Sequence, residues 1–138
     1  MRTSVGRVHL IEARGRGRLP TVVVLHGLFG SGANWRSVAR ALAPHHRVLC
    51  VDLRNHGHSP WTDSMDYLEM ADDVRALIAR QGLSRPTVVG HSMGGKTAML
   101  LACRHPERVE RLVVVDIAPK DYYWVAHRGE FLAMTELD

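Results

Sequence analysis

Four short runs of apolar, mostly β-branched residues constrain the fold of this chain more than any other feature. They cover residues 21–25, 48–51, 87–89 and 112–115, and none of them alternates polar with apolar positions. Continuous apolar strands are typical of parallel sheets that are covered on both faces, whereas strands with one wet face alternate. A looser alternation over residues 5–13 predicts an additional strand, in a hairpin at the edge of the sheet.

Helical spacing of apolar residues fills the segments between these runs and predicts three helices, over residues 35–42, 65–81 and 93–104. Asp63 or Ser64 is expected to cap the second helix at its start, and Gly82 to end it. The alternation of strands and helices predicts an α/β fold, with a mostly parallel sheet, right-handed crossovers and helices on both faces. Ligands of such sheets bind at the carboxyl ends of the strands, so the loops there are the candidates for a site.

The composition of the 138 residues fits one globular domain, and its positive charge does not point to nucleic acid. The net charge is +4, but the basic residues are spread over the expected helices and loops, without a stripe on one face or interleaved aromatic residues. We therefore expect solvated arginines and no nucleic-acid partner. Cys50 and Cys103 lie in apolar stretches and are expected to be buried, and no Cys/His spacing indicates a metal site.

The apolar runs are also too short to span a bilayer, and residues 1–14 lack the continuous apolar segment of a secretory signal. The expectation is a cytoplasmic protein without a membrane span. Nothing in the sequence indicates its oligomeric state.

The strongest indication of chemistry is a G-x-S-x-G motif directly after the third run, formed by Gly90, His91, Ser92, Met93 and Gly94 and followed by Gly95. Between a strand and a helix, this motif is typical of a nucleophile elbow, a sharp turn that exposes the serine hydroxyl above the sheet. Glycines are needed two residues before and after the serine because side chains would clash there. Ser92 is thus a candidate nucleophile, and the Met93 N–H a candidate donor to an oxyanion. The alternative is a glycine-rich turn that merely packs well.

A second loop agrees with this interpretation. The first run ends in His26, Gly27, Leu28, Phe29 and Gly30. An oxyanion hole usually takes its second backbone N–H from the loop after this strand. We expect Leu28 to supply it, with Phe29 as the other possible donor. His26 is expected to form hydrogen bonds within the loop rather than to act as a general base.

The second run is followed by a loop that contains His56 and His58. Two histidines could suggest a metal site, but no carboxylate or third histidine completes a ligand set nearby. Hydrogen bonds that order the loop are the favoured interpretation.

Four segments in this order and spacing resemble the α/β-hydrolase superfamily: HGLFGSGANW, VDLRNHGHSP, GHSMGGKTAM and VVVDIAPKDY. The specific resemblance is to its bacterial serine esterases and acyl thioesterases, and it runs over residues 21–123. It implies the α/β-hydrolase fold and hydrolysis of small-molecule carboxylic esters or acyl thioesters through an acyl-serine intermediate, without a metal or organic cofactor. Ser92 matches the family nucleophile, and Leu28 and Met93 match the oxyanion positions.

For the other two members of the catalytic triad, the sequence offers a candidate acid but no evident histidine. In this fold the acid and then the histidine follow the serine along the chain. Asp116, at the end of the fourth run, is a possible triad acid, and the alternative is a residue that orders the loop before Ala118. Only His105 and His127 follow Ser92. His105 is expected at the far end of a helix about 18 Å long, out of reach of the serine.

The resemblance therefore assigns residues 1–120 to the N-terminal part of the hydrolase core and residues 121–138, which contain His127, to an incomplete start of the cap. The last strands of the fold are expected to be missing, which would leave the edge of the strand at 112–115 open to pairing. Because no general base is evident, activity of this chain alone is in question. A catalytically silent fragment or ligand-binding module is the alternative function.

Overall fold

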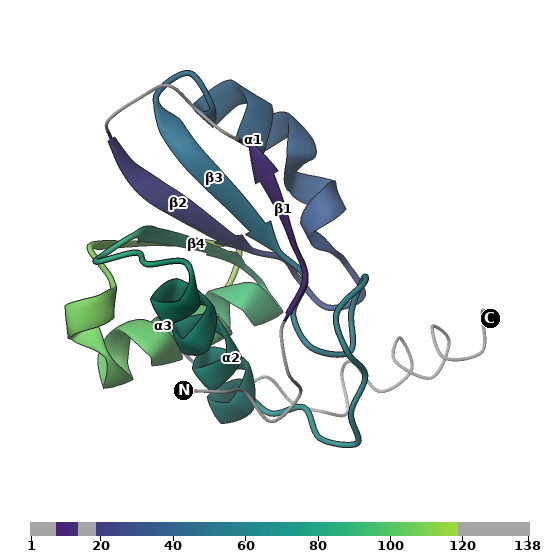
Figure 1. The fold of residues 1–138 in the computed structure, drawn as a ribbon. Coiled ribbons are helices and arrows are strands. Elements are labelled where there is room, and N and C mark those ends of the chain that lie inside the picture. Colours follow the sequence, from purple (N-terminus) through teal and green to yellow (C-terminus); the bar gives the residue numbers. More distant parts are fainter. Residues whose placement is uncertain (1–7, 14–18, 119–138) are drawn as a thin grey trace.

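The computed structural model describes residues 8–13 and 19–118, which form one five-stranded sheet with helices on both faces (Figure 1). The strands are β1 (Leu10–Ala13), β2 (Leu19–Leu25), β3 (His46–Val51), β4 (Thr87–His91) and β5 (Arg111–Val115). The helices are α1 (Arg36–Leu42), α2 (Tyr67–Arg80), α3 (Met93–Arg104) and two short 3₁₀ helices, η1 (Gly32–Trp35) and η2 (Pro106–Arg108). The predicted α/β fold and each predicted strand and helix of its core are confirmed.

The strands lie in the order β1-β3-β2-β4-β5, and all neighbours except β1 and β3 are parallel. Leu25 at the end of β2 is level with Val51 of β3 and with Gly90 of β4. The loops that follow these three strands therefore leave the sheet side by side. This register brings the three loops singled out from the sequence to one edge.

Two apolar cores cover the two faces of the sheet. On one face, Val23 and Leu25 pack with α2 and α3, where Leu77 and Leu101 are fully buried. On the other face, Val24 and its neighbours pack against α1. Both faces are dry, which is why the strands carry unbroken apolar runs.

β1 departs from the hairpin that the sequence predicts. It is an edge strand, as expected, but it pairs antiparallel with β3, with Leu10 opposite Val51, and not with the next strand in the sequence. The reason is that β2 already has β3 on one side and β4 on the other. The neighbouring strand β3 has its other edge free for β1 to join.

The start of α2 and one cysteine also differ from the prediction. Asp66, not Asp63 or Ser64, caps α2, and its side chain accepts a hydrogen bond from the Glu69 N–H at 2.7 Å. Gly82 follows the helix with φ +68°, as expected for its end.

Cys50 is buried as predicted, but Cys103 is exposed. The buried stripe of α3 follows Gly94, Thr97, Ala98 and Leu101. Cys103 is two positions beyond Leu101 and so falls off this stripe, since a helix returns to the same face every three or four residues.

β5 forms the other edge of the sheet within the described residues, and its Leu112 and Val113 are exposed. Residues 121–138, assigned above to a cap, lie outside the described part of the chain, as does His127. Within residues 8–13 and 19–118, no helix has both the length and the apolar character needed to cross a bilayer.

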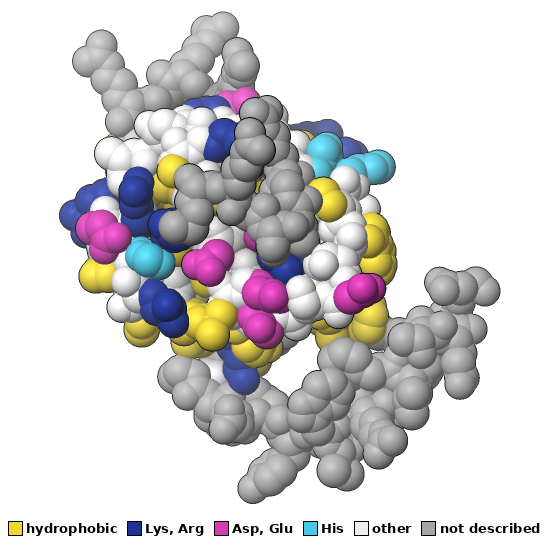
Figure 2. All heavy atoms as spheres, turned by 60° about the horizontal axis from the view of Figure 1, so that its bottom comes forward, with side chains coloured by type: hydrophobic (Ala, Val, Ile, Leu, Met, Phe, Trp, Pro, Cys, Tyr) yellow, Lys and Arg dark blue, Asp and Glu magenta, His cyan; other side chains and the backbone are white. Residues whose placement is uncertain are grey.

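Figure 2 shows basic and acidic side chains interspersed on the face that it draws. Several arginines have acidic partners, such as Arg85 with Glu110 at 3.1 Å and Arg47 with Glu12. The absence of a nucleic-acid partner stays a prediction.

Candidate active site

Ser92 lies on a strained elbow between β4 and α3. Its backbone angles, φ 52° and ψ −115°, are in a region that residues with a side chain rarely adopt. Its N–H donates a hydrogen bond to the Val115 carbonyl oxygen at 3.2 Å, which ties the elbow to β5. A Cβ added at Gly90 would lie 2.3 Å from the Gly94 carbonyl oxygen, and one added at Gly94 would lie 2.3 Å from that of Leu25. Both glycines are therefore required for the elbow to form.

Gly95 allows α3 to lie close to the end of the sheet. A Cβ there would lie 2.5 Å from a methyl group of Ile117 and 3.3 Å from one of Val114. Met93 is the first residue of α3, so its N–H has no partner within the helix and lies at the positive end of the helix dipole.

The loop after β2 meets this elbow. A Cβ added at Gly27 would lie only 3.4 Å from the Cβ of Ser92. Leu28 follows, and within the described residues its N–H forms no hydrogen bond. The N–H of Phe29, in contrast, donates to the His56 Nε2 at 3.1 Å. Of the two predicted oxyanion donors in this loop, Leu28 is the one whose N–H is not already engaged.

His26 forms the loop hydrogen bonds that the sequence predicts. Its Nδ1 donates to the Gly27 carbonyl oxygen at 2.7 Å, and its Nε2 accepts from the Leu53 N–H at 3.0 Å. Burial lowers the pKa of His26 by more than the hydrogen bond to Gly27 raises it. The ring is therefore neutral, and it joins the loop after β2 to the loop after β3.

His56 and His58 also order the loop in which they lie. The His56 Nδ1 donates to the Arg54 carbonyl oxygen at 2.8 Å, and the His58 N–H donates to Asp52 at 3.0 Å. Since both ring nitrogens of His56 are bonded to backbone groups, the loop-ordering interpretation of this histidine is confirmed. No group of three or more His, Cys, Asp or Glu suited to a metal ion occurs in the described ranges.

Asp52 organises the loop after β3, a role that the sequence interpretation missed. Its carboxylate accepts hydrogen bonds from the Gly32 N–H at 2.7 Å, the His58 N–H at 3.0 Å and the His9 Nδ1 at 2.8 Å. Burial raises the pKa of Asp52, but these hydrogen bonds outweigh it and hold the pKa below 3.8. The sequence signal for this role was a glycine, Gly57. It has a φ of +52°, and it lies so close to the Asp52 carboxylate that a Cβ would not fit.

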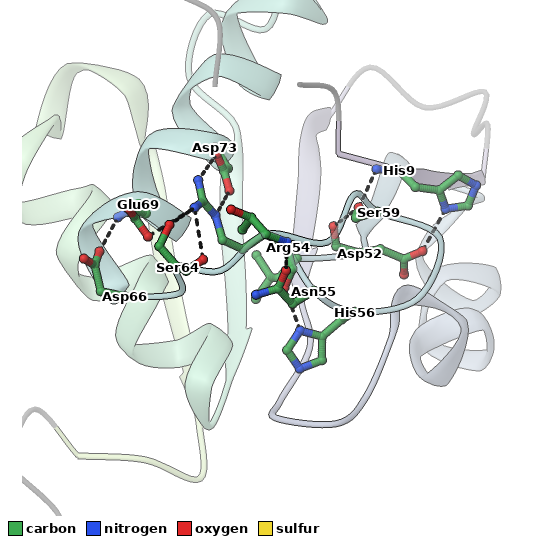
Figure 3. Close-up of polar contacts among 12 residues, drawn as sticks. His9, Asp52, Arg54, Asn55, His56, Ser59, Ser64, Asp66, Glu69 and Asp73 are labelled. Carbon is green, nitrogen blue, oxygen red and sulfur yellow. Dashed lines mark hydrogen bonds and ion pairs between the residues drawn. The ribbon is translucent and has the colours of Figure 1, made fainter. Parts of the chain in front are cut away.

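Arg54 is a second residue that the sequence interpretation missed. It is 1% exposed and forms hydrogen bonds with both carboxylate oxygens of Asp73, at 2.6 and 2.9 Å (Figure 3). A further nitrogen donates to Glu69 at 3.1 Å and to the Ser64 carbonyl oxygen at 3.3 Å. The bond with Asp73 raises the pKa of Arg54 above its usual value, whereas burial raises the pKa of Asp73 by more than Arg54 lowers it. The two short, parallel hydrogen bonds between the groups are the geometry of a charged guanidinium–carboxylate pair. The pair anchors the loop after β3 to α2.

Asp116 follows β5 beside the elbow, since Val115 is level with His91 and accepts the hydrogen bond from Ser92. It is exposed and has φ 56°. Its carboxylate forms no hydrogen bond or ion pair within the described residues. Both roles of Asp116, as triad acid and as a residue that orders the loop, stay predictions.

No histidine in the described residues is bonded to the Ser92 hydroxyl. The ring of His91 packs against that of Trp35, with 6.1 Å between centroids. His105 follows the last residue of α3, and its Nδ1 lies 3.5 Å from Glu107. These geometries offer no Ser–His pair within residues 8–13 and 19–118.

The strand order, the elbow and the adjoining loops together define an α/β hydrolase core, and the sequence profile of the alpha/beta hydrolase fold matches residues 20–131. The chain belongs to this family. Among its relatives is the sn-1-specific diacylglycerol lipase ABHD11 of Mus musculus, 50% identical over 121 residues, which cover 86% of this chain and 39% of the relative. Esterase YbfF of Escherichia coli is 42% identical over 113 residues, covering 82% of this chain and 44% of the esterase.

Among solved structures, a marine microorganism esterase has a TM-score of 0.89 at 39% sequence identity. The match covers 96% of this chain and 52% of the esterase. The chain thus spans about half, or less, of the length of the relatives that it matches. The predicted fold family and its esterase branch are confirmed.

Proposed function

We propose that this chain carries the nucleophile and the oxyanion hole of a serine hydrolase that cleaves small-molecule carboxylic esters or acyl thioesters. The observation that carries the proposal is the elbow at Ser92, which adopts strained backbone angles at the start of a helix and lies against Gly27 in the loop after β2. Strain of this kind persists where the surrounding structure enforces it, and it is concentrated at functional sites. The names of the relatives, which include esterases and a lipase, support the same class of reaction.

In the proposed reaction, the Ser92 oxygen attacks the carbonyl carbon and loses its proton to a base, while the carbonyl oxygen becomes an oxyanion. The N–H groups of Leu28 and Met93 donate hydrogen bonds to that oxyanion. Collapse of the intermediate breaks the bond to the alcohol or thiol, which leaves with a proton. Water then attacks the acyl-serine, which releases the acyl group as a carboxylic acid and restores the Ser92 hydroxyl. No metal or organic cofactor takes part in these steps.

The proposal also needs the other two members of the catalytic triad, an acid and a histidine. Asp116 would orient a histidine, which in turn would take the proton from Ser92. No histidine of the described residues is within hydrogen-bond contact of Ser92, so these residues by themselves would support only a slow reaction, through substrate binding and the oxyanion hole. The same observation favours the second candidate function, a catalytically silent module that binds a ligand.

Labelling with a fluorophosphonate probe tests the proposal, with Ser92→Ala as the matched control. We expect covalent labelling that mass spectrometry assigns to Ser92 and that the variant lacks. We also expect hydrolysis of p-nitrophenyl acetate above the rate in buffer, lost in the same variant. Labelling that persists in Ser92→Ala would assign the reactivity elsewhere. No labelling, together with a rate equal to that of buffer, would support the silent module.

A further inference from the structure

Two buried histidines form reciprocal hydrogen bonds between the loop after β2 and the loop after β3. His26, at the end of β2, accepts from the N–H of Leu53 in the second loop at 3.0 Å. His56, in the second loop, accepts from the N–H of Phe29 in the first at 3.1 Å. The two rings lie 5.0 Å apart, and each loop thus holds a backbone amide of the other. We call this pair of rings the histidine clasp.

The hydrogen bonds define the protonation of both rings. Each Nδ1 faces a backbone carbonyl oxygen, that of Gly27 at 2.7 Å for His26 and that of Arg54 at 2.8 Å for His56. A carbonyl oxygen can only accept, so each Nδ1 carries the proton. Each Nε2 receives a backbone N–H, so it carries none. Both rings are therefore neutral and have the same tautomer, and both are buried, at 1% and 7% exposure.

The clasp acts on the turn that would bind the oxyanion. Phe29 has φ 61°, an unfavourable conformation for a residue with a side chain, and the Gly30 N–H closes the turn on the Gly27 carbonyl oxygen at 3.0 Å. The bond to His56 holds the Phe29 N–H in this conformation and turns it toward the second loop. The preceding N–H, that of Leu28, stays without a partner in the described residues and directly follows Gly27, which lies against the elbow of Ser92.

The second loop is itself fixed, so His56 has a rigid support. The carbonyl of Arg54 holds the His56 ring, and the Arg54 side chain is held by Asp73 and Glu69 of α2 (Figure 3). A ring supported in this way can determine the position of the loop that it contacts.

We propose that His26 and His56 are positioning residues, which hold the turn at Leu28 and Phe29 in the conformation that directs the Leu28 N–H toward an oxyanion. This inference rests on the proposed function for its catalytic consequence, but the clasp itself can be tested without activity. Neither ring would touch the substrate. Each acts through the backbone amide that it accepts.

His56→Leu and His56→Gln form the central pair of variants. Leucine removes the acceptor, whereas the glutamine side chain can place an oxygen near the position of Nε2. His58→Leu is the matched control, because this histidine lies in the same loop and its ring is not part of the clasp. Measurements are the rate of Ser92 labelling by the fluorophosphonate probe and hydrogen exchange of the Phe29 amide. Nitrogen NMR of the unmodified protein reports the tautomers of both rings.

We expect a protonated Nδ1 and a bare Nε2 on both His26 and His56. In His56→Leu the Phe29 amide should lose protection, and labelling should slow by about tenfold or more, since one oxyanion donor is worth roughly 10²–10³ in rate. His56→Gln should recover part of both effects, and His58→Leu should change neither.

A proton on Nε2 of either ring would overturn the proposal, and this result does not require any variant to fold. Labelling that stays at the unmodified rate while the Phe29 amide is exposed would overturn it as well. If the unmodified chain is not labelled at all, the proposed function fails. In that case the tautomers and the exchange of the Phe29 amide still decide whether the clasp holds the loop.

The titratable groups that act on the clasp are few. Burial lowers the pKa of His26 most, His56 also lowers it, and Asp52 raises it. The labelling rate of the unmodified protein should therefore fall as the pH is lowered through the depressed pKa of His26, when protonation of that ring removes the acceptor of the Leu53 N–H. In His26→Gln, whose side chain can accept a hydrogen bond without titrating, this decrease should be smaller, whereas an effect of other titrating groups would be shared by both proteins.

Discussion

Arg54 and Asp73 are 19 positions apart in the sequence and form two hydrogen bonds, of 2.6 and 2.9 Å, although each is only 1% exposed. An ion pair this far from water is retained because each charge compensates the other. It joins the loop after β3 to the first half of α2. This ion pair supports the position of His56, whose ring is bonded to the Arg54 carbonyl. His56 in turn holds the turn that lies beside Ser92.

Removing one partner of this pair should therefore destabilise the protein strongly. For Asp73→Asn we expect a loss of about 3–5 kcal/mol in the free energy of unfolding, because the buried Arg54 charge would keep only the partly exposed carboxylate of Glu69 as a counterion. Urea unfolding measures it. Glu110→Gln breaks an exposed pair with Arg85 and should cost less than about 1 kcal/mol. Equal losses in the two variants would contradict a buried, charged pair.

Gly94→Ala should prevent the elbow from forming. The added Cβ would lie 2.3 Å from the Leu25 carbonyl oxygen and 2.5 Å from that of His26, and rigid strands leave neither atom free to move. We expect at least about 1–3 kcal/mol of destabilisation from overpacking, together with loss of Ser92 labelling.

Gly82→Asn is the control for the elbow, because Gly82 has φ +68° but open space around it. Asparagine tolerates this conformation, so the effect should be a small loss of stability with labelling unchanged. A Gly94→Ala protein that unfolds and labels like the unmodified chain would show that the close contact at the elbow is not present.

The stability of the protein should decrease as the pH falls below 6.5, in part because of His26. Burial lowers the pKa of His26 in the folded state, so the unfolded chain binds more protons in this range. The contribution of the neutral ring is complete above pH 6.5 and is lost as the pH falls through the lowered pKa. In His26→Gln, whose side chain can accept from Leu53 without titrating, the free energy of unfolding should depend less on pH between 7 and about 5. An unchanged slope would contradict a buried, neutral ring.

Asp52 should act in a more acidic range. Its pKa lies below 3.8 in the folded protein, so its stabilising effect is present above that pH and is lost as the pH falls further. Asp52→Asn should flatten the dependence of stability on pH below 4. His9→Gln, which removes one of three hydrogen bonds to the carboxylate, should flatten it only in part. Denaturant unfolding at a series of pH values distinguishes the two.

Asp116→Asn separates the two roles considered for that residue. Asparagine tolerates the φ of 56° and removes only the charge. If Asp116 is the triad acid, the probe should label Ser92 more slowly in the variant when the protein also supplies the catalytic histidine. The stability should then stay nearly unchanged. If Asp116 orders the loop, the midpoint of unfolding should fall while the labelling rate is kept.

The sequence by itself determined the order of strands and helices and the position of the elbow. The apolar runs, the spacing within each helix and the glycines around Ser92 act on residues close to them in the chain, so their pattern is visible there. The edge position of the first strand was also predictable from its looser alternation. The fold family followed from motifs that are themselves local.

Only the tertiary structure decided which distant groups meet. The partner of β1, the exposure of Cys103, the bond between Arg54 and Asp73 and the histidine clasp all depend on how the sheet brings loops together. His26 and Leu53 are 27 positions apart, as are Phe29 and His56. No local pattern relates residues at such a separation. They meet because parallel pairing of β2 with β3 aligns the two strand ends, and burial then requires every polar group there to find a partner.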